Sequence, residues 1–244
     1  MSTFKVVVFL VVIVTVNCAS LPSYIKTCAR TLSPQEFSKC ATENGKLAIP
    51  SVLKGDRTFK VPPMVPLRLP KVELQAGQGL KLKATDIIAS GLDTVNLQDI
   101  TADFDNKKFT AKLHFDYITI VGDYEVDGRL LVPLRGHGPL NISIYDVNVE
   151  YGFNYDLVKK NGADYINVKS DTLKLKSQKQ FYKLDNLFGN PRISEETNKV
   201  LNENASEISK ELNGPVSEII KTLVTQLVKN YMTGVSIAEI FPEK

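Results

Sequence analysis

The 244-residue chain is predicted to be an α+β protein in which an antiparallel sheet wraps around a long, kinked C-terminal helix. Apolar residues recur at every second position from about 72 to 175, the period of a strand with one buried face. They then recur at three- and four-residue steps from Glu195 to Tyr231, the period of one helix face. A helix of that length spans roughly 55 Å, whereas a spherical domain of this size is about 45 Å across. The molecule should therefore be elongated.

The first residues have the layout of a secretory signal peptide. Lys5 is followed by an apolar run from Val6 to Val16 and by small residues around Ala19. A transmembrane anchor needs about 20 apolar residues, and this run has roughly half that. We expect residues 1–19 to be a signal peptide and residues 20–244 to form a single lipid-binding domain that is secreted and extracellular, with an uncleaved anchor as the alternative.

The N-terminal part of the secreted domain should contain a disulfide and a short helix. Removal of the leader leaves Cys28 and Cys40, and an even pair in an oxidising compartment predicts one disulfide. It would close a loop of about a dozen residues, worth roughly 3 kcal/mol. Ser33 and Glu36 have the spacing of a capping box, with a proline between them at the first helical position. We expect this helix to end at Gly45.

Prolines and turn dipeptides divide the chain that follows. Five prolines in the range Pro50–Pro70 predict an extended or looped stretch instead of a long helix. Asp105-Asn106 and Asn161-Gly162 are turn dipeptides between strand-like runs, so the middle of the chain should be an antiparallel meander.

The parity of the apolar positions changes twice within this meander. One change falls between Tyr117 and Ile118, and the other between Ile144 and Val147. Both predict bulges, which bend long strands. A bent sheet is also the surface with enough apolar area to cover a long amphipathic helix.

The C-terminal helical pattern begins after Asn190-Pro191 and is interrupted near its middle by Gly214-Pro215. Proline removes one backbone hydrogen bond, so we expect a kink there. Two separate helices are the alternative.

Several segments in fixed order resemble the takeout and haemolymph juvenile-hormone-binding family of insects. The longest is Gly122–Gly138, and the likeness extends over nearly the whole secreted chain. The other segments that carry it are Ala89–Leu92, Leu184–Phe188, Leu201–Asn204 and the pair Cys28 and Cys40.

The resemblance implies a super-rolled antiparallel sheet around the long C-terminal helix, related to tubular lipid-binding folds and enclosing an apolar cavity. Similar proteins carry terpenoid hormones, fatty acids or other long-chain lipids. The juvenile-hormone binders of this family typically have a second disulfide. The three cysteines of this chain do not allow one once the leader is removed, so the likeness is to the takeout branch.

The apolar stripes carry the functional prediction. Alternating apolar residues ordinarily form a packed core, but a sheet wrapped on a rod can leave a channel, as the resemblance implies. A ligand of about fifteen carbons offers up to roughly 12 kcal/mol before ordering costs. A hydroxyl of Tyr124 or Tyr231 is expected to orient a polar end group. The candidate lining residues are Phe115, Ile118, Ile120, Tyr124, Leu131, Ile142, Val149, Phe153, Leu223, Leu227 and Tyr231.

Signals of catalysis, metal binding and nucleotide binding are missing from the sequence. No Gly-x-Ser-x-Gly elbow occurs, and neither His114 nor His137 has a nucleophile beside it. Asp103–Asn106 begins like a calcium loop but lacks the glycine and the glutamate that such a loop needs. We therefore expect a binding protein with no cofactor and no metal, and not an enzyme.

The net charge and the glycosylation sequons indicate which partners and modifications to expect. A formal net charge of +3 gives no nucleic-acid signature. The sequons at Asn141 and Asn204 predict N-glycosylation. We expect a monomer without stable membrane insertion, with a small hydrophobic ligand and a cell-surface receptor as partners. The alternatives are recognition of membrane or bacterial lipids, a hormone-processing esterase, and a signalling protein with a solid core.

A loose basic stretch predicts a solvated strand face and consists of Lys159, Lys160, Lys169, Lys174, Lys176, Lys179 and Lys183.

Overall fold

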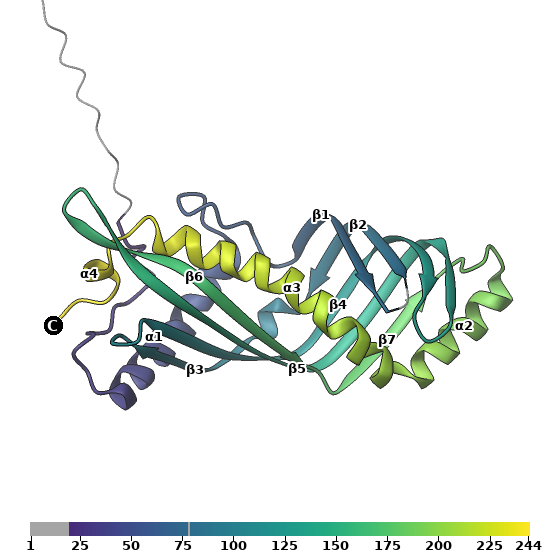
Figure 1. Ribbon diagram of the computed structural model, residues 1–244, viewed down its shortest axis with the longest axis horizontal. Coiled ribbons are helices and arrows are strands. Elements are labelled where there is room, and N and C mark those ends of the chain that lie inside the picture. Colours follow the sequence, from purple (N-terminus) through teal and green to yellow (C-terminus); the bar gives the residue numbers. More distant parts are fainter. Residues whose placement is uncertain (1–19, 78) are drawn as a thin grey trace, which may run out of the picture.

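The computed structural model describes residues 20–77 and 79–244, so the expected signal peptide lies outside the described residues. The molecule is elongated, with α1 and α4 at one end, α2 at the other, and α3 running between them (Figure 1). The helices are α1 (Pro34–Lys54), η1 (Leu92–Thr94), α2 (Pro191–Glu203), α3 (Ala205–Met232) and α4 (Ile237–Ile240). The strands are β1 (Leu67–Ala76), β2 (Leu80–Ser90), β3 (Asn96–Asp103), β4 (Lys108–Arg129), β5 (Pro133–Lys160), β6 (Ala163–Lys176) and β7 (Lys179–Leu184).

The antiparallel sheet consists of two halves that share the long strands β4 and β5. In one half the order is β1-β2-β4-β5-β7, and in the other β3 pairs with the start of β4 while β6 pairs with the end of β5. β5 alone has 28 residues, which corresponds to roughly 90 Å of extended chain. The two turns predicted at Asp105-Asn106 and Asn161-Gly162 are confirmed, since β3–β4 and β5–β6 are joined there.

The predicted parity changes are present, but they are not one-sided bulges. β4 and β5 keep a single register on both sides, with Phe115 opposite Val147 and Ile118 opposite Ile144. In both strands the inward positions shift by one residue at the same level of the sheet, where Asp146 has a left-handed φ of 53°. Because each strand contributes an extra residue, the pairing resumes without a shift.

Helix α1 is longer than predicted. Its start is confirmed, since Ser33 and Glu36 form the capping box. The end predicted at Gly45 is wrong, because the helix continues through Gly45 and Pro50 to Lys54. Gly45 instead allows close packing on β3, where an added β-carbon would lie 2.5 Å from Leu97 Cδ2.

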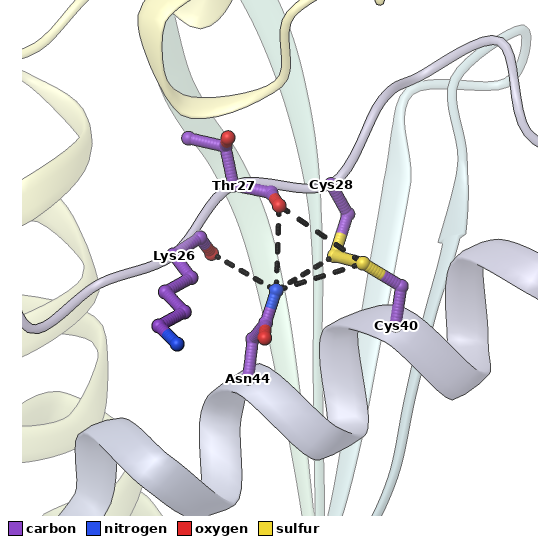
Figure 2. Close-up of a disulfide and its surroundings, with 5 residues drawn as sticks. All are labelled: Lys26, Thr27, Cys28, Cys40 and Asn44. Carbon is purple, nitrogen blue, oxygen red and sulfur yellow. Dashed lines mark hydrogen bonds between the residues drawn. A yellow bond between two sulfur atoms is a disulfide. The ribbon is translucent and has the colours of Figure 1, made fainter.

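The predicted disulfide is present. Cys28 and Cys40 are bonded, which ties the N-terminal segment to α1 (Figure 2). One turn after Cys40, the side-chain amide of Asn44 donates hydrogen bonds to the carbonyls of Thr27 at 3.3 Å and Lys26 at 3.5 Å. The disulfide and the amide together hold the segment before α1 against the helix.

The C-terminal helical region consists of two helices, but they do not divide at Gly214-Pro215, where a kink was predicted and a division was the alternative. Helix α3 runs without a break through Gly214-Pro215, and the division falls at Asn204, between α2 and α3. Pro215 has no N–H for the carbonyl of Glu211, and Glu211 is exposed, so water can satisfy that carbonyl. With 28 residues, α3 is about 42 Å long.

Helix α2 covers the free edge of β7 with two asparagines. The Asn202 side chain accepts from Tyr182 N and donates to Tyr182 O, both at 2.8 Å. Asn198, one turn earlier, pairs in the same way with Leu184, at 2.9 and 2.8 Å. The amides thus act as the strand that is missing at this edge.

Buried apolar side chains gather in three clusters. The α2-end cluster contains Tyr124 and Leu201. The disulfide-end cluster contains Phe37 and Phe153. The third contains Phe59 and lies around the end of α3. No helix of the described residues is long and apolar enough to cross a membrane.

Candidate ligand-binding interior

The middle of the molecule belongs to none of the three packed clusters. Along β4, Phe109 is in the disulfide-end cluster and Ile120 packs on the α2-end cluster, while the inward residues between them belong to neither. On β5, Ile142 packs on the α2-end cluster and Tyr151 belongs to the disulfide-end cluster, and the inward residues between them are in neither. On α3 the same holds for the inward residues between Leu212 and Val224. We call the intervening set the central stretch, and it consists of Leu113, Phe115, Ile118, Ile144, Val149, Val216, Ile219, Ile220 and Leu223.

Side chains of the central stretch keep accessible surface. All are partly exposed, and Leu223 is 37% exposed. Val147, across from Phe115, is buried. The stretch covers roughly 20–30 Å, judged from twelve helical residues on α3 and nine extended residues on β5.

Helix α3 rests on the rims of the sheet. Its main strand neighbours are β6, β7 and β1, which are edge strands. The central strands β4 and β5 are not among its main neighbours. The helix therefore closes the rolled sheet as a seam along its edge strands.

The structure brings four of the predicted lining residues into the central stretch: Phe115 and Ile118 on β4, Val149 on β5, and Leu223 on α3. Others flank it. Ile120, Leu131 and Ile142 pack on the α2-end cluster, and Leu227 and Tyr231 on the cluster around Phe59. Tyr124 and Phe153 are only 3% and 7% exposed, so they form the packed ends rather than a wall of open space.

Both tyrosine hydroxyls predicted to orient a ligand already have protein partners. Tyr124 donates to the carbonyl of Asp185 at 2.7 Å, and burial raises the Tyr124 pKa to about 12. The Tyr231 hydroxyl lies 3.0 Å from that of Tyr24, which in turn donates to Asp56 at 2.6 Å. Neither hydroxyl is left for a ligand.

A buried polar contact fixes α3 to the sheet. The Tyr151 hydroxyl lies 2.8 Å from Thr225 Oγ1, which also donates to Asp171 on β6. Burial raises the pKa of Tyr151. These side chains satisfy one another, so they hold the seam at the disulfide end.

One inward polar residue was missed from the sequence. Tyr182 on β7 lies opposite Ile142 and packs on the α2-end cluster. The signal was available, because Gln180, Tyr182 and Leu184 alternate with exposed residues along a six-residue strand. The preceding segment of the chain is rich in lysine, which concealed the alternation.

A hollow of about 830 Å³ opens on the surface beside α1. Ile49 and Leu53 of α1 line it together with Val65 and Leu97. It contains no residue of the central stretch, so it is separate from the predicted interior.

Lysines of the basic stretch form ion pairs on the surface, as expected for a solvated strand face. Lys169 pairs with Asp156 at 3.4 Å and Lys174 with Glu150 at 2.8 Å. Among the described residues, no group of three His, Cys, Asp or Glu side chains is arranged to hold a metal ion.

Comparisons with known proteins agree with this architecture. A crystal structure of Takeout 1 from Epiphyas postvittana superposes with a TM-score of 0.78 over 88% of this chain and 98% of that one, at 24% identity. The circadian clock-controlled protein daywake of Drosophila melanogaster is 25% identical over 161 residues, which are 64% of this chain and 62% of that protein.

The family comparison covers almost the whole chain. Residues 6–242 match the family described as haemolymph juvenile hormone binding protein (JHBP). The predicted antiparallel sheet is confirmed by the likeness to Takeout 1, and two helices, α2 and α3, stand where one long C-terminal helix was predicted. The chain is therefore a member of the haemolymph juvenile hormone binding protein family.

Proposed function

We propose that the protein is a secreted carrier that binds a small hydrophobic molecule in the interior between its packed ends. The observation that carries this proposal is the central stretch, where inward apolar side chains of three elements remain partly exposed. Its family, whose description names the binding of a hormone, supports the same function.

The proposed mechanism is reversible sequestration without catalysis. Each methylene removed from water contributes about 0.8 kcal/mol, so a chain of fifteen carbons can reach micromolar affinity or better after ordering costs. The protein contributes an apolar surface that is already formed, and no covalent step is required. A juvenile-hormone-like terpenoid, a fatty acid or another long-chain lipid fits the length of the central stretch.

A substitution that fills the interior tests the proposal. We choose Ile118→Trp, in the central stretch, and compare it with Thr119→Trp, the next residue of the same strand, whose side chain alternates to the other face. Overfilling a packed core costs about 1–3 kcal/mol, whereas a side chain that enters open space should cost less than that. We expect Ile118→Trp to fold with nearly unchanged stability and to bind at least ten-fold more weakly.

The binding assay uses delipidated protein and tritiated methyl palmitate. Saturable one-to-one binding that survives high salt and is lost in Ile118→Trp supports the carrier. Binding to anionic vesicles that weakens with salt would instead support recognition of membrane lipids. Absence of saturable binding by the wild type, together with no lipid in native mass spectra of the secreted protein, overturns the proposal.

A further inference from the structure

We propose that the Tyr182 hydroxyl is the polar contact for the ligand and that it selects an uncharged oxygen, such as an ester or ketone carbonyl, over a carboxylate. This inference rests on the proposed function, because it concerns the ligand of the same interior.

The position of Tyr182 is inward and rigid. It pairs with Ile142 across β5 and β7, and its next inward neighbour on β5 is Ile144 of the central stretch. Its backbone N–H and carbonyl are both held by Asn202. Two hydrogen bonds therefore hold the Tyr182 backbone at the α2 end of the central stretch.

The hydroxyl of Tyr182 lacks a hydrogen-bond partner among residues 20–77 and 79–244. The hydroxyls of Tyr124 and Tyr151 have protein partners, whereas the hydrogen bonds of Tyr182 involve only its backbone. No side-chain oxygen in this part of the chain is both fully buried and unpaired, so the Tyr182 hydroxyl keeps accessible surface. Desolvation alone raises the Tyr182 pKa to about 12. An oxygen that is desolvated, accessible and unpaired is placed to meet a ligand atom.

Other polar groups at this end are already engaged. Gln180, the inward residue two positions earlier, donates from its amide to Ser177 at 2.5 Å. Ser194 donates to the carbonyl of Leu184 at 3.0 Å. Of these three side chains, Tyr182 is the one that makes no side-chain hydrogen bond within the part of the chain that the structure describes.

The charge of the interior favours a neutral ligand. The fully buried polar side chains among the described residues are Gln180, Ser194 and Thr225, and none of them carries a charge. A carboxylate that enters would lose its water without gaining a cation, and such burial is strongly unfavourable. A phenol hydroxyl can donate one hydrogen bond to a carbonyl at little cost.

The experiment compares three probes of one chain length, namely hexadecane, methyl palmitate and palmitate, on delipidated wild type and Tyr182→Phe. We expect the wild type to bind methyl palmitate most tightly. Loss of one neutral hydrogen bond should weaken methyl palmitate binding to Tyr182→Phe by roughly 2- to 10-fold, while hexadecane affinity stays the same. Tyr145→Phe, on the outer face of the sheet, is the matched control and should bind like the wild type.

An infrared measurement reports the contact directly. The carbonyl band of ¹³C-labelled methyl palmitate should lie at lower frequency in the wild type than in Tyr182→Phe, because a hydrogen bond weakens the C=O bond. Equal carbonyl frequencies and equal ester affinities in the two proteins overturn the role of Tyr182 as the ligand contact, but not the preference for a neutral ligand. Palmitate binding more tightly than the ester at pH 7 overturns the neutral-ligand class. Failure of the wild type to bind any of the three probes counts against the proposed function itself.

Discussion

The Asn202 side chain offers the sharpest test of how the edge of the sheet is held. It makes three hydrogen bonds, two to the backbone of Tyr182 and one from Nδ2 to the carbonyl of Asn198 at 2.8 Å. In Asn202→Ala, two backbone groups of β7 lose their partner, at about 1–3 kcal/mol each when water does not replace it. Alanine regains up to about 0.7 kcal/mol through its helix propensity. We expect a net loss of about 1–5 kcal/mol.

Urea unfolding followed by circular dichroism measures this loss, with the midpoint and slope fitted separately. Asn213→Ala on the exposed side of α3 is the control. Its side chain makes one weak contact with Ser217, at 3.3 Å, and its removal should change stability by less than about 0.5 kcal/mol. A loss below 1 kcal/mol for Asn202→Ala would refute the view that the amide replaces a strand.

Three further outcomes follow from the structure. Replacing Cys28 and Cys40 together by serine should lower the free energy of unfolding by roughly 3 kcal/mol, measured in urea, and no change would contradict a stabilising disulfide. Asn141 is exposed, whereas Asn204 uses its amide on the carbonyl at position 200. Peptide-N-glycosidase treatment followed by peptide mass spectrometry should thus find a glycan at Asn141. A glycan found at Asn204 alone would contradict this expectation. Burial raises the Tyr182 pKa from 10 to about 12, so above pH 10 the unfolded chain loses the hydroxyl proton before the folded protein does, and the wild type loses stability as the pH rises toward 12. Tyr182→Phe has no such proton, so the unfolding midpoint of the wild type should fall relative to that of Tyr182→Phe over this range, and a constant difference would contradict this reasoning.

The repeating features of the fold were predictable from the sequence. Alternation predicted the strands, and turn dipeptides located two of their connections at Asp105-Asn106 and Asn161-Gly162. Ser33 and Glu36 located the start of α1 because a capping box is a local interaction. Features that depend on neighbouring residues in the sequence were therefore recovered well.

Features that depend on distant contacts were not predictable in the same way. In the sequence Gly45 indicates a helix end, but in the structure it is a point of close contact with Leu97 of β3, which lies 52 positions away. Asn204 carries no strong signal for a break, yet α2 must turn there to cover the edge of β7. Pro215 does carry a signal, and its cost is low because the neighbouring chain is exposed.

The candidate site was predicted only in part, for a related reason. Alternation identifies the inward face of β4 and β5, so Phe115, Ile118 and Val149 could be named. It does not distinguish an inward residue in a packed cluster, such as Phe153, from one outside the clusters, such as Phe115. Tyr182 was missed because β7 is short and its pairing partner Ile142 is 40 positions away.

The central claim is that apolar side chains enclose open space between the two packed ends. Diffraction from crystals of delipidated protein under xenon pressure tests it, because xenon occupies apolar cavities that water leaves empty. We predict xenon sites in contact with Phe115, Ile118 and Ile220. Side chains that meet across the interior, with no xenon bound there, would contradict the account.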